Sequence, residues 1–200
     1  KHRELSPALR SVHRIILQTL VDTGKAPTQG RIAAILGSKA AALEALGQFK
    51  AADLVVLSAP VVFNEKTKQH VADAAAEIVG AYPMSTQATA HKVTSNGQTV
   101  NAMCAVDALS ISAMFGRETQ IESKCHVTGT PIRLRVNGTS VLEASTPDIH
   151  VGIRWQSLQG CAAKNICTEM VFLKDTATAE SWRKTDPESI DILTLSEAIE

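Results

Sequence analysis

A cysteine and an aspartate stand three residues apart at the start of an apolar segment, Cys104-Ala-Val-Asp107, and Cys167 follows about sixty residues later. If the segment is helical, residues three apart share a face, and the thiol then lies beside the carboxylate. Two thiols and a carboxylate could bind a soft metal and transfer a proton. We therefore take Cys104, Asp107 and Cys167 as the candidate catalytic and metal-binding residues, although spacing alone does not bring Cys167 to the other two.

The surroundings of this pair predict how its side chains ionise. Cys104 stands where the helix should begin, and the partial positive charge of a helix N-terminus lowers the pKa of a thiol. Asp107 is the only acid between residues 102 and 115, so its apolar neighbours should raise its pKa. The ordinary alternatives are a cysteine that is simply a small buried side chain and an acid that complements the helix dipole.

The remaining cysteines and the histidines do not form a familiar metal or nucleophile motif. No Cys-x-x-Cys, His-Glu-x-x-His, glycine-rich phosphate loop or Gly-x-Ser-x-Gly sequence is present. We interpret Cys125 as structural, whereas Cys161 has no assignable role. A chain of this size does not need disulfides, so we expect free thiols in a reducing cytoplasm.

The composition is that of a folded protein with enough residues for one or two small domains. The chain has 200 residues, 44% of them hydrophobic, and no net charge. No apolar run approaches the roughly 18 to 20 residues that cross a membrane. The chain starts at Lys1 and not at Met, so a leader could have been removed. Residues 1–50 carry eight Lys/Arg against three Asp/Glu, which leaves this part mildly basic.

The pattern of apolar and turn residues predicts an α+β protein. An N-terminal winged-helix-like module (1–68) is expected to precede a connecting segment (69–84) and a mixed α/β catalytic domain with antiparallel strands (85–200). Helices are predicted at 7–22, after the N-cap residues Thr28 and Ser38, at 104–115, at 177–184 and from 195 onward. Strands are predicted at 53–57, 60–63, 89–93, 99–102, 119–122, 132–136, 150–155 and 166–173, with tight turns at 95–98 and at Asn137-Gly138.

The winged-helix pattern raises the question of DNA binding. Two short strands, 53–57 and 60–63, were expected to form the wing after three helices. The presumed recognition helix, Lys39 to Lys50, contains mostly alanine and leucine and almost none of the Arg, Asn and Gln that read bases. We therefore expect the module to be structural and do not expect DNA as a partner.

Four stretches resemble the bacterial organomercurial lyase (alkylmercury lyase) family. They are Asn101-Ala-Met-Cys-Ala-Val-Asp-Ala-Leu109, Gly116-Arg117, Ser123-Lys-Cys-His-Val-Thr-Gly-Thr-Pro-Ile132, and Cys167 onward to Thr178-Ala-Glu-Ser-Trp182. The resemblance implies that Cys104 and Cys167 bind mercury, that Asp107 is the acid/base between them, and that Cys125 is structural. It also implies a winged-helix-like module before an α+β catalytic domain.

The chain departs from the family pattern beside these residues. Met103 stands where the family typically has an aromatic residue, Asn101 also replaces a usual aromatic, and Thr168 stands where family members can have a second cysteine. Cys104, Asp107 and Cys167 are all present, but the residues beside them differ from the family pattern. An apolar wall is expected to receive the organic group and to exclude water, and its candidate members are Met103, Met114, Phe115 and Ile166.

The predicted reaction is cleavage of a carbon–mercury bond by protonolysis to a hydrocarbon and Hg(II), without a resident cofactor. Low-molecular-weight thiols should be needed for turnover, and the resemblance implies handover of Hg(II) to a mercuric reductase. Two alternatives stay open: an enzyme that cleaves another organometal, such as an organotin, and a non-enzymatic thiol protein that binds metal or regulates transcription through the winged helix. Tight, salt-sensitive DNA binding would favour the regulator.

Overall fold

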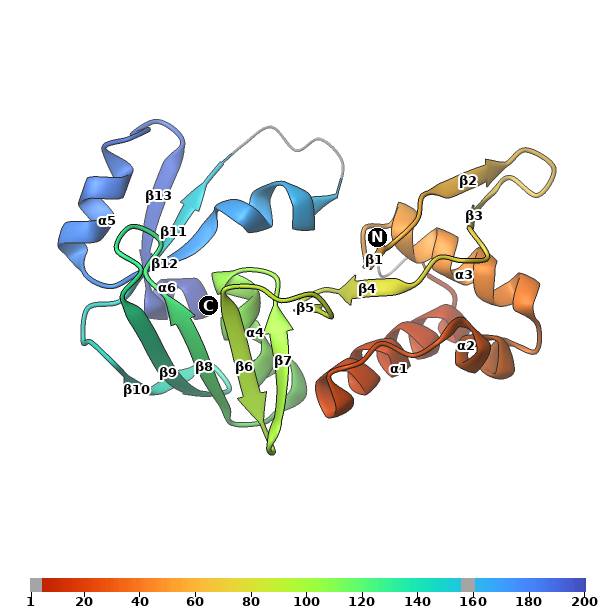
Figure 1. Cartoon of the computed structure of the whole chain (residues 1–200), viewed down its shortest axis with the longest axis horizontal. Helices are drawn as coiled ribbons and strands as arrows, with labels where there is room; N and C mark the ends of the chain where they lie inside the picture. Colours follow the sequence, from red (N-terminus) through yellow and green to blue (C-terminus); the bar gives the residue numbers. More distant parts are fainter. Residues whose placement is uncertain (1–4, 156–160) are drawn as a thin grey trace. The chain divides into compact units, whose positions relative to one another are not determined.

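The computed structural model describes residues 5–155 and 161–200, apart from the side chain of Lys164. The chain forms two compact units, Lys1–Gln87 and Ala88–Glu200 (Figure 1). Both combine helices with antiparallel strand pairs, which confirms the predicted α+β class. In the described part of the chain, no helix is both long enough and apolar enough to cross a bilayer.

Unit 1 begins with three helices, and the starts of the second and third were predicted from capping residues. They are α1 (Pro7–Thr23), α2 (Gln29–Leu36) and α3 (Lys39–Ala51). The hydroxyl of Thr28 accepts the Arg31 N–H, and that of Ser38 accepts the Ala41 N–H. These bonds satisfy donors that have no partner inside the helix, so α2 and α3 start where the sequence indicated.

The strands of unit 1 pair differently from the predicted wing. They are β1 (Val55–Leu57), β2 (Val61–Asn64), β3 (Gln69–Ala72), β4 (Ile78–Ala81) and β5 (Met84–Ser85). The predicted strands at 53–57 and 60–63 exist, but β1 pairs with β4 and β2 pairs with β3, so their expected pairing with each other is wrong. Residues 69–84, expected to be a connecting segment, contribute β3 and β4 to this unit.

Helix α3 packs directly on the β2–β3 hairpin. A Cβ atom at Gly47 would lie 2.1 Å from the backbone oxygen of His70, so only glycine permits this approach. Ala42, Leu46 and Phe49 of the same helix are fully buried. The middle of α3 is therefore occupied by contacts within unit 1.

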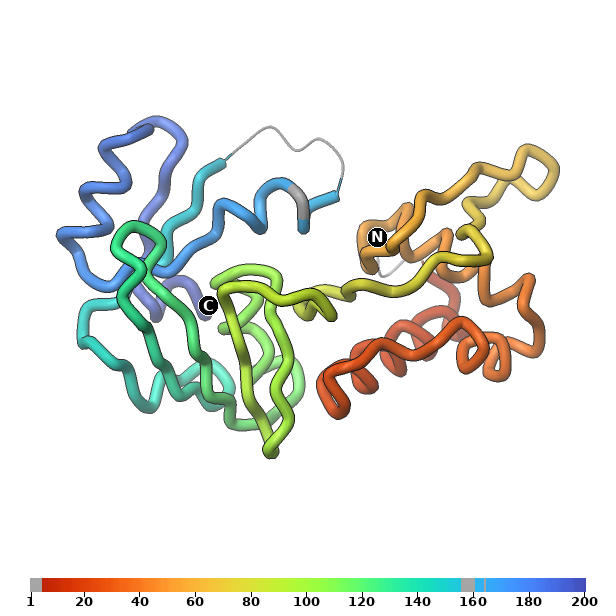
Figure 2. The backbone as a smooth tube through the Cα atoms, viewed as in Figure 1, coloured from red at the N-terminus to blue at the C-terminus, as the bar shows by residue number. Residues whose placement is uncertain are grey.

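Unit 2 contains two antiparallel sheets and the apolar helix α4 (Ala105–Phe115). Within this unit the first sheet has the order β7-β6-β8-β9-β10, and the second has the order β12-β11-β13 (Figure 1). Figure 2 traces the same chain as a backbone tube. Their strands are β6 (His91–Ser95), β7 (Gln98–Ala102), β8 (Thr119–Lys124), β9 (Pro131–Asn137), β10 (Ser140–Ala144), β11 (His150–Arg154), β12 (Met170–Leu173) and β13 (Ile190–Thr194). The other elements are the 3-10 helices η2 (Ala162–Lys164) and η3 (Ile166–Glu169) and the α-helices α5 (Thr176–Arg183) and α6 (Leu195–Ile199).

The core of unit 2 lies between α4 and the strands. Helix α4 contacts β6, β7, β8 and β9 of the first sheet as well as β12 of the second. Ala105, Ala108 and Leu109 on the helix are buried, as are Ile121 of β8 and Phe172 of β12. Because α4 touches both sheets, its first turn lies within reach of side chains from either of them.

The predicted β-hairpin forms the strand pair that leads into α4. Strands β6 and β7 pair with His91 opposite Ala102 and Ser95 opposite Gln98. Asn96 and Gly97 form the turn with positive φ angles of 50° and 77°, the conformation that Asn-Gly sequences favour. The hairpin register therefore fixes where the chain leaves β7 and where α4 begins.

Candidate active site

Cys104 is held at the start of α4 as its N-cap residue. Only Met103 separates it from the end of β7, and its backbone is extended while the next residue is helical. The Cys104 Sγ accepts the backbone N–H of Asp107 at 3.3 Å and donates to Asp107 Oδ2 at 3.0 Å. The predicted helix and the predicted contact between this thiol and carboxylate are both confirmed.

Cys167 lies in a 3-10 helix and not in the predicted strand. Residues 166–169 form η3, and only Met170–Leu173 of the predicted 166–173 strand are extended, as β12. The backbone N–H of Met170 donates to the carbonyl of Cys167, which closes the turn. The apolar character of this segment made it look like a buried strand, but the tight turn aims Cys167 toward α4.

The two thiols and the carboxylate meet. One ligand atom from each of Cys104, Asp107 and Cys167 lies within 4.8 Å of the others. Among residues 5–155 and 161–200, no other group of three His, Cys, Asp or Glu side chains could hold a metal ion in this way. Cys104 and Cys167 are buried free thiols. The arrangement offers two soft ligands with a proton carrier beside them.

The cluster changes the ionisation of its own members. The pKa of the Cys104 thiol is raised by its hydrogen bond with Cys167, by burial and by the charge of Asp107. This contradicts the expectation that the helix N-terminus lowers that pKa, because these three effects outweigh the dipole. Burial also raises the pKa of Asp107, as predicted, against the opposing effect of hydrogen bonds from the two thiols. These two shifts favour a protonated Cys104 thiol beside a carboxyl group that binds a proton more readily than a free aspartate.

A cavity of about 490 Å³ opens beside the cluster within unit 2. Its lining includes Cys167, Met103 and Met170, together with the aromatic ring of Phe172 and the imidazole of His91. A small organic group bound to a metal at the thiols could occupy this space. Because the cavity reaches Cys167 itself, we take it as the entrance to the site.

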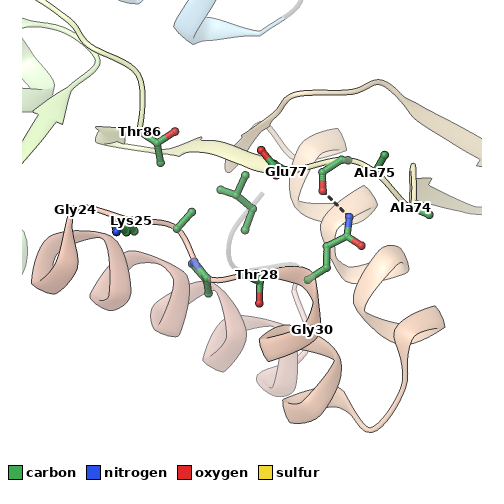
Figure 3. A pocket seen from close by; sticks show the side chains of 13 residues that line it. Gly24, Lys25, Thr28, Gly30, Ala74, Ala75, Glu77 and Thr86 are labelled. Atoms are coloured by element: carbon green, nitrogen blue, oxygen red, sulfur yellow. Dashed lines mark hydrogen bonds between the residues drawn. The ribbon is translucent and has the colours of Figure 1, made fainter.

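A larger cavity, of about 740 Å³, lies in unit 1 between the start of α2 and the segment before β4 (Figure 3). Its wall is formed largely by alanine and glycine, and Lys25 and Glu77 are the charged residues that line it. The Gln29 amide donates to the backbone oxygen of Ala76 at its edge. No cysteine or histidine lines it, so size alone does not mark the reactive site of this protein.

The family model for alkylmercury lyase (MerB) matches residues 84–200, which is more than half of the chain. The chain belongs to the alkylmercury lyase family. The matched residues include the whole of unit 2 and therefore all three members of the cluster.

Curated relatives and a solved structure agree with this membership. The alkylmercury lyase of Bacillus cereus is 34% identical over 121 residues, which are 56% of this chain and 51% of the relative. That of Staphylococcus epidermidis is 29% identical over 128 residues, 64% of this chain and 58% of the relative. The chain thus spans about half the length of the curated lyases that it matches. A crystal structure of the mercury-bound form of MerB2 has the same fold, with a TM-score of 0.75 at 22% identity over 98% of this chain and 89% of that one.

The prediction of which residues form the apolar wall of the substrate site is partly wrong. Met114 and Phe115 lie at the far end of α4, about 15 Å along the helix axis from Cys104 at 1.5 Å per residue. They cannot touch a group bound at the thiols, and Met114 is 50% exposed. Met103 does line the cavity beside the cluster. Ile166 is buried next to Cys167, and its role as a wall stays a prediction.

Cys125 lies outside the cluster, in a tight loop after β8. Its backbone N–H donates to the Thr130 carbonyl, and its own carbonyl accepts the Gly129 N–H. Burial raises the pKa of its thiol. Hydrogen bonds from Thr128 and from the backbone of Lys174 and Val127 lower this pKa by more than burial raises it, so the net shift is downward. These bonds tie the loop to the segment after β12 and support the structural role that we predicted.

Two residues near the site were missed in the sequence. Met170 places its Sδ 3.7 Å from the Cys104 Sγ. His91 is buried in the cavity wall, where a 2.9 Å hydrogen bond joins its Nδ1 to the Ser123 hydroxyl. The strand assumed for 166–173 would have put Met170 and Cys167 on opposite faces. No sequence pattern indicated His91, because its burial depends on strand pairing and on Phe172 from the second sheet.

His91 makes the stability of this lyase-family protein depend on pH. Burial lowers its pKa from 6.5 to about 4, so the imidazole stays neutral in the folded state while the unfolded chain binds a proton. The unfolded state therefore takes up more protons between pH 6.5 and pH 4, and folding weakens as the pH falls through this window. We expect a loss of about 3 kcal/mol in the free energy of unfolding, measured by urea titration at each pH.

The His91→Asn variant is the matched control for this effect. It cannot be protonated, so the difference in stability between wild type and variant should shrink as the pH falls from 6.5 to 4. A difference that stays constant across this range would show that His91 is not the group responsible.

Proposed function

We propose that this protein cleaves carbon–mercury bonds by protonolysis and gives a hydrocarbon and Hg(II). The observation that carries the proposal is the convergence of Cys104, Asp107 and Cys167 within 4.8 Å. Membership of the alkylmercury lyase family supports it. A carbon–mercury bond resists water because the carbon must leave with the bonding electron pair, and a site with two soft ligands and an acid meets that need.

Each residue has one role in the proposed sequence. The Cys104 sulfur binds the organomercury cation first, and its proton is released to solvent. Asp107 accepts the proton of Cys167, whose sulfur becomes the second ligand of mercury. Asp107 then donates this proton to the carbon as the carbon–mercury bond breaks, so the hydrocarbon leaves and Hg(II) stays on two thiolates. The raised pKa of Asp107 suits a group that must hold a proton between these steps.

Release of mercury is the step that the protein does not perform alone. Two buried thiolates hold a soft cation tightly, so external low-molecular-weight thiols must take it away. No resident cofactor enters this proposal, because mercury arrives as substrate and leaves as product. Delivery of Hg(II) to a mercuric reductase, as the family resemblance implies, would complete the detoxification.

We propose that unit 1 is a winged-helix-like module with a structural role. We do not propose DNA as its partner. The middle of α3, the expected recognition helix, is buried against the β2–β3 hairpin at Gly47, and only its first residues and Ala51 are exposed. A helix packed in this way offers few side chains to a DNA groove. The free thiols of Cys104, Cys125 and Cys167 support our proposal of a reducing, cytoplasmic location.

Turnover of simple organomercurials tests the proposed function. Incubation with methylmercury or phenylmercury and excess thiol should release methane or benzene, measured by headspace gas chromatography, together with inorganic mercury. A reaction with thiol alone is the control. Hydrocarbon no higher than this control would reject lyase activity and leave a thiol protein that only binds metal.

A further inference from the structure

A third sulfur lies beside the two cysteines of the cluster. The thioether Sδ of Met170 is 3.7 Å from the Cys104 Sγ, and Met170 lines the same cavity as Cys167. Its side chain is only partly exposed. The site thus contains two thiols, the Asp107 carboxylate and a thioether, and the Cys104 sulfur lies next to both the carboxylate and the thioether.

Local structure keeps Met170 in this position. Met170 directly follows the 3-10 helix η3, and its backbone N–H donates to the carbonyl of Cys167, which keeps the two residues close together beside the same cavity. The residue is also the first of β12, where it pairs with Ile153 of the central strand β11. The backbone of Met170 is therefore held by the turn and by the sheet, whereas its flexible side chain can move toward a bound ion.

A thioether has the chemistry to interact with the same ion as the thiols. Methionine sulfur, like cysteine sulfur, is a soft ligand that favours soft metal ions. A weak and long methionine bond is known to tune metals held mainly by stronger ligands. Because the thioether is neutral and carries no proton, it adds electron density without changing the charge of the site.

We propose that Met170 is a third sulfur ligand of mercury in this protein, at longer range than Cys104 and Cys167. The inference deepens the proposed function, on which it rests, by assigning a residue to the same site. Binding forms one coordinate bond from a thioether lone pair to mercury, with no proton released and no change of oxidation state. The third sulfur would strengthen retention of Hg(II) after the hydrocarbon has left.

X-ray absorption at the mercury edge of the full-length protein tests this inference directly. Protein labelled with selenomethionine is loaded with one equivalent of HgCl₂, so that any methionine ligand scatters as selenium and any cysteine ligand as sulfur. We expect two sulfur scatterers and one selenium scatterer at longer distance. The measurement needs no organomercurial, so its outcome is independent of whether the lyase assay succeeds.

Variants identify which of the four methionines supplies the signal. Met170→Leu should lose the selenium scatterer and bind Hg(II) about tenfold more weakly in competition with a dithiol chelator, the lower end of the usual effect of a supporting metal contact. Met103→Leu should keep the scatterer. Met114→Leu, at the far end of α4, should keep both the scatterer and the affinity.

Two results would overturn the inference. One is the absence of selenium near mercury in the labelled wild-type protein. The other is a selenium scatterer that persists in Met170→Leu. Should Met170→Leu fail to fold, judged by circular dichroism, the other three methionines are replaced by leucine one at a time: a selenium scatterer that persists in Met84→Leu, Met103→Leu and Met114→Leu assigns the signal to Met170, and its loss in any of them overturns the inference.

Discussion

Replacing Cys104 by serine is expected to abolish hydrocarbon release from phenylmercury, with a fall of at least about 10⁴-fold, the scale seen when one member of a catalytic unit is removed. Serine keeps the size and the N-cap hydrogen bond to Asp107, so α4 should still form. What is lost is the soft ligand, because an alcohol oxygen binds mercury poorly and is not deprotonated near neutral pH. Gas chromatography of the benzene formed provides the measurement.

Cys161→Ser is the matched control for this experiment. It removes a thiol from the same unit but from outside the cluster of Cys104, Asp107 and Cys167. We expect its turnover to stay within about twofold of wild type, since changes away from key contacts usually have small effects. Appreciable benzene production by Cys104→Ser, above the thiol-only background, would remove Cys104 from the mechanism.

The part of the site that the sequence predicted correctly depends on local structure. Cys104 and Asp107 are three residues apart in one helix, and the capping position and the apolar run of α4 are properties of neighbouring residues. The hairpin before it was equally local, because Asn96-Gly97 selects its own turn. In both cases a short stretch of chain contains all the interactions that decide its conformation.

Positions set by tertiary contacts were predicted less well. Cys167 was chosen as a candidate and does lie beside Cys104 and Asp107, but in the sequence only the family resemblance joined it to Cys104. Its segment was assigned as a strand, because a short apolar run is ambiguous between a buried strand and a turn of helix. The 3-10 turn forms where the chain enters β12 beside β11, and this depends on pairing with Ile153, far away in sequence. Because of this error Met170 was missed, since a continuous strand would place Cys167 and Met170 on opposite faces, whereas both line one cavity in the structure.

The strand pairing in unit 1 failed for a similar reason. The strands at β1 and β2 were predicted from their own composition, and adjacent strands were assumed to pair. In the structure β1 pairs with β4, and Val55 lies opposite Ala81. Partner choice depends on which apolar faces the helices cover, and local sequence does not contain that information.

The environment of Asp107 supports the proposal that its carboxyl group carries a proton in this reaction. Burial raises its pKa, whereas the hydrogen bonds from Cys104 and Cys167 oppose that rise. In the proposed reaction mercury displaces the Cys104 proton first, so the hydrogen bond from this thiol that stabilises the Asp107 carboxylate is lost. The proton affinity of Asp107 therefore increases before Cys167 must give up its proton, so Asp107 can take that proton and hold it until the carbon accepts it.

Asp107→Asn is expected to bind organomercurials but to turn them over at least about 100-fold more slowly than wild type, the usual scale for loss of a general acid. Asparagine keeps the shape of the side chain and both thiols, so one equivalent of phenylmercury should still be retained after gel filtration. Single-turnover release of benzene gives the rate. Asp186→Asn, an equal change of charge outside the cluster, should react as wild type does. Near-normal release by Asp107→Asn would mean that the proton reaches carbon from another donor, such as water in the cavity or the Cys167 thiol itself.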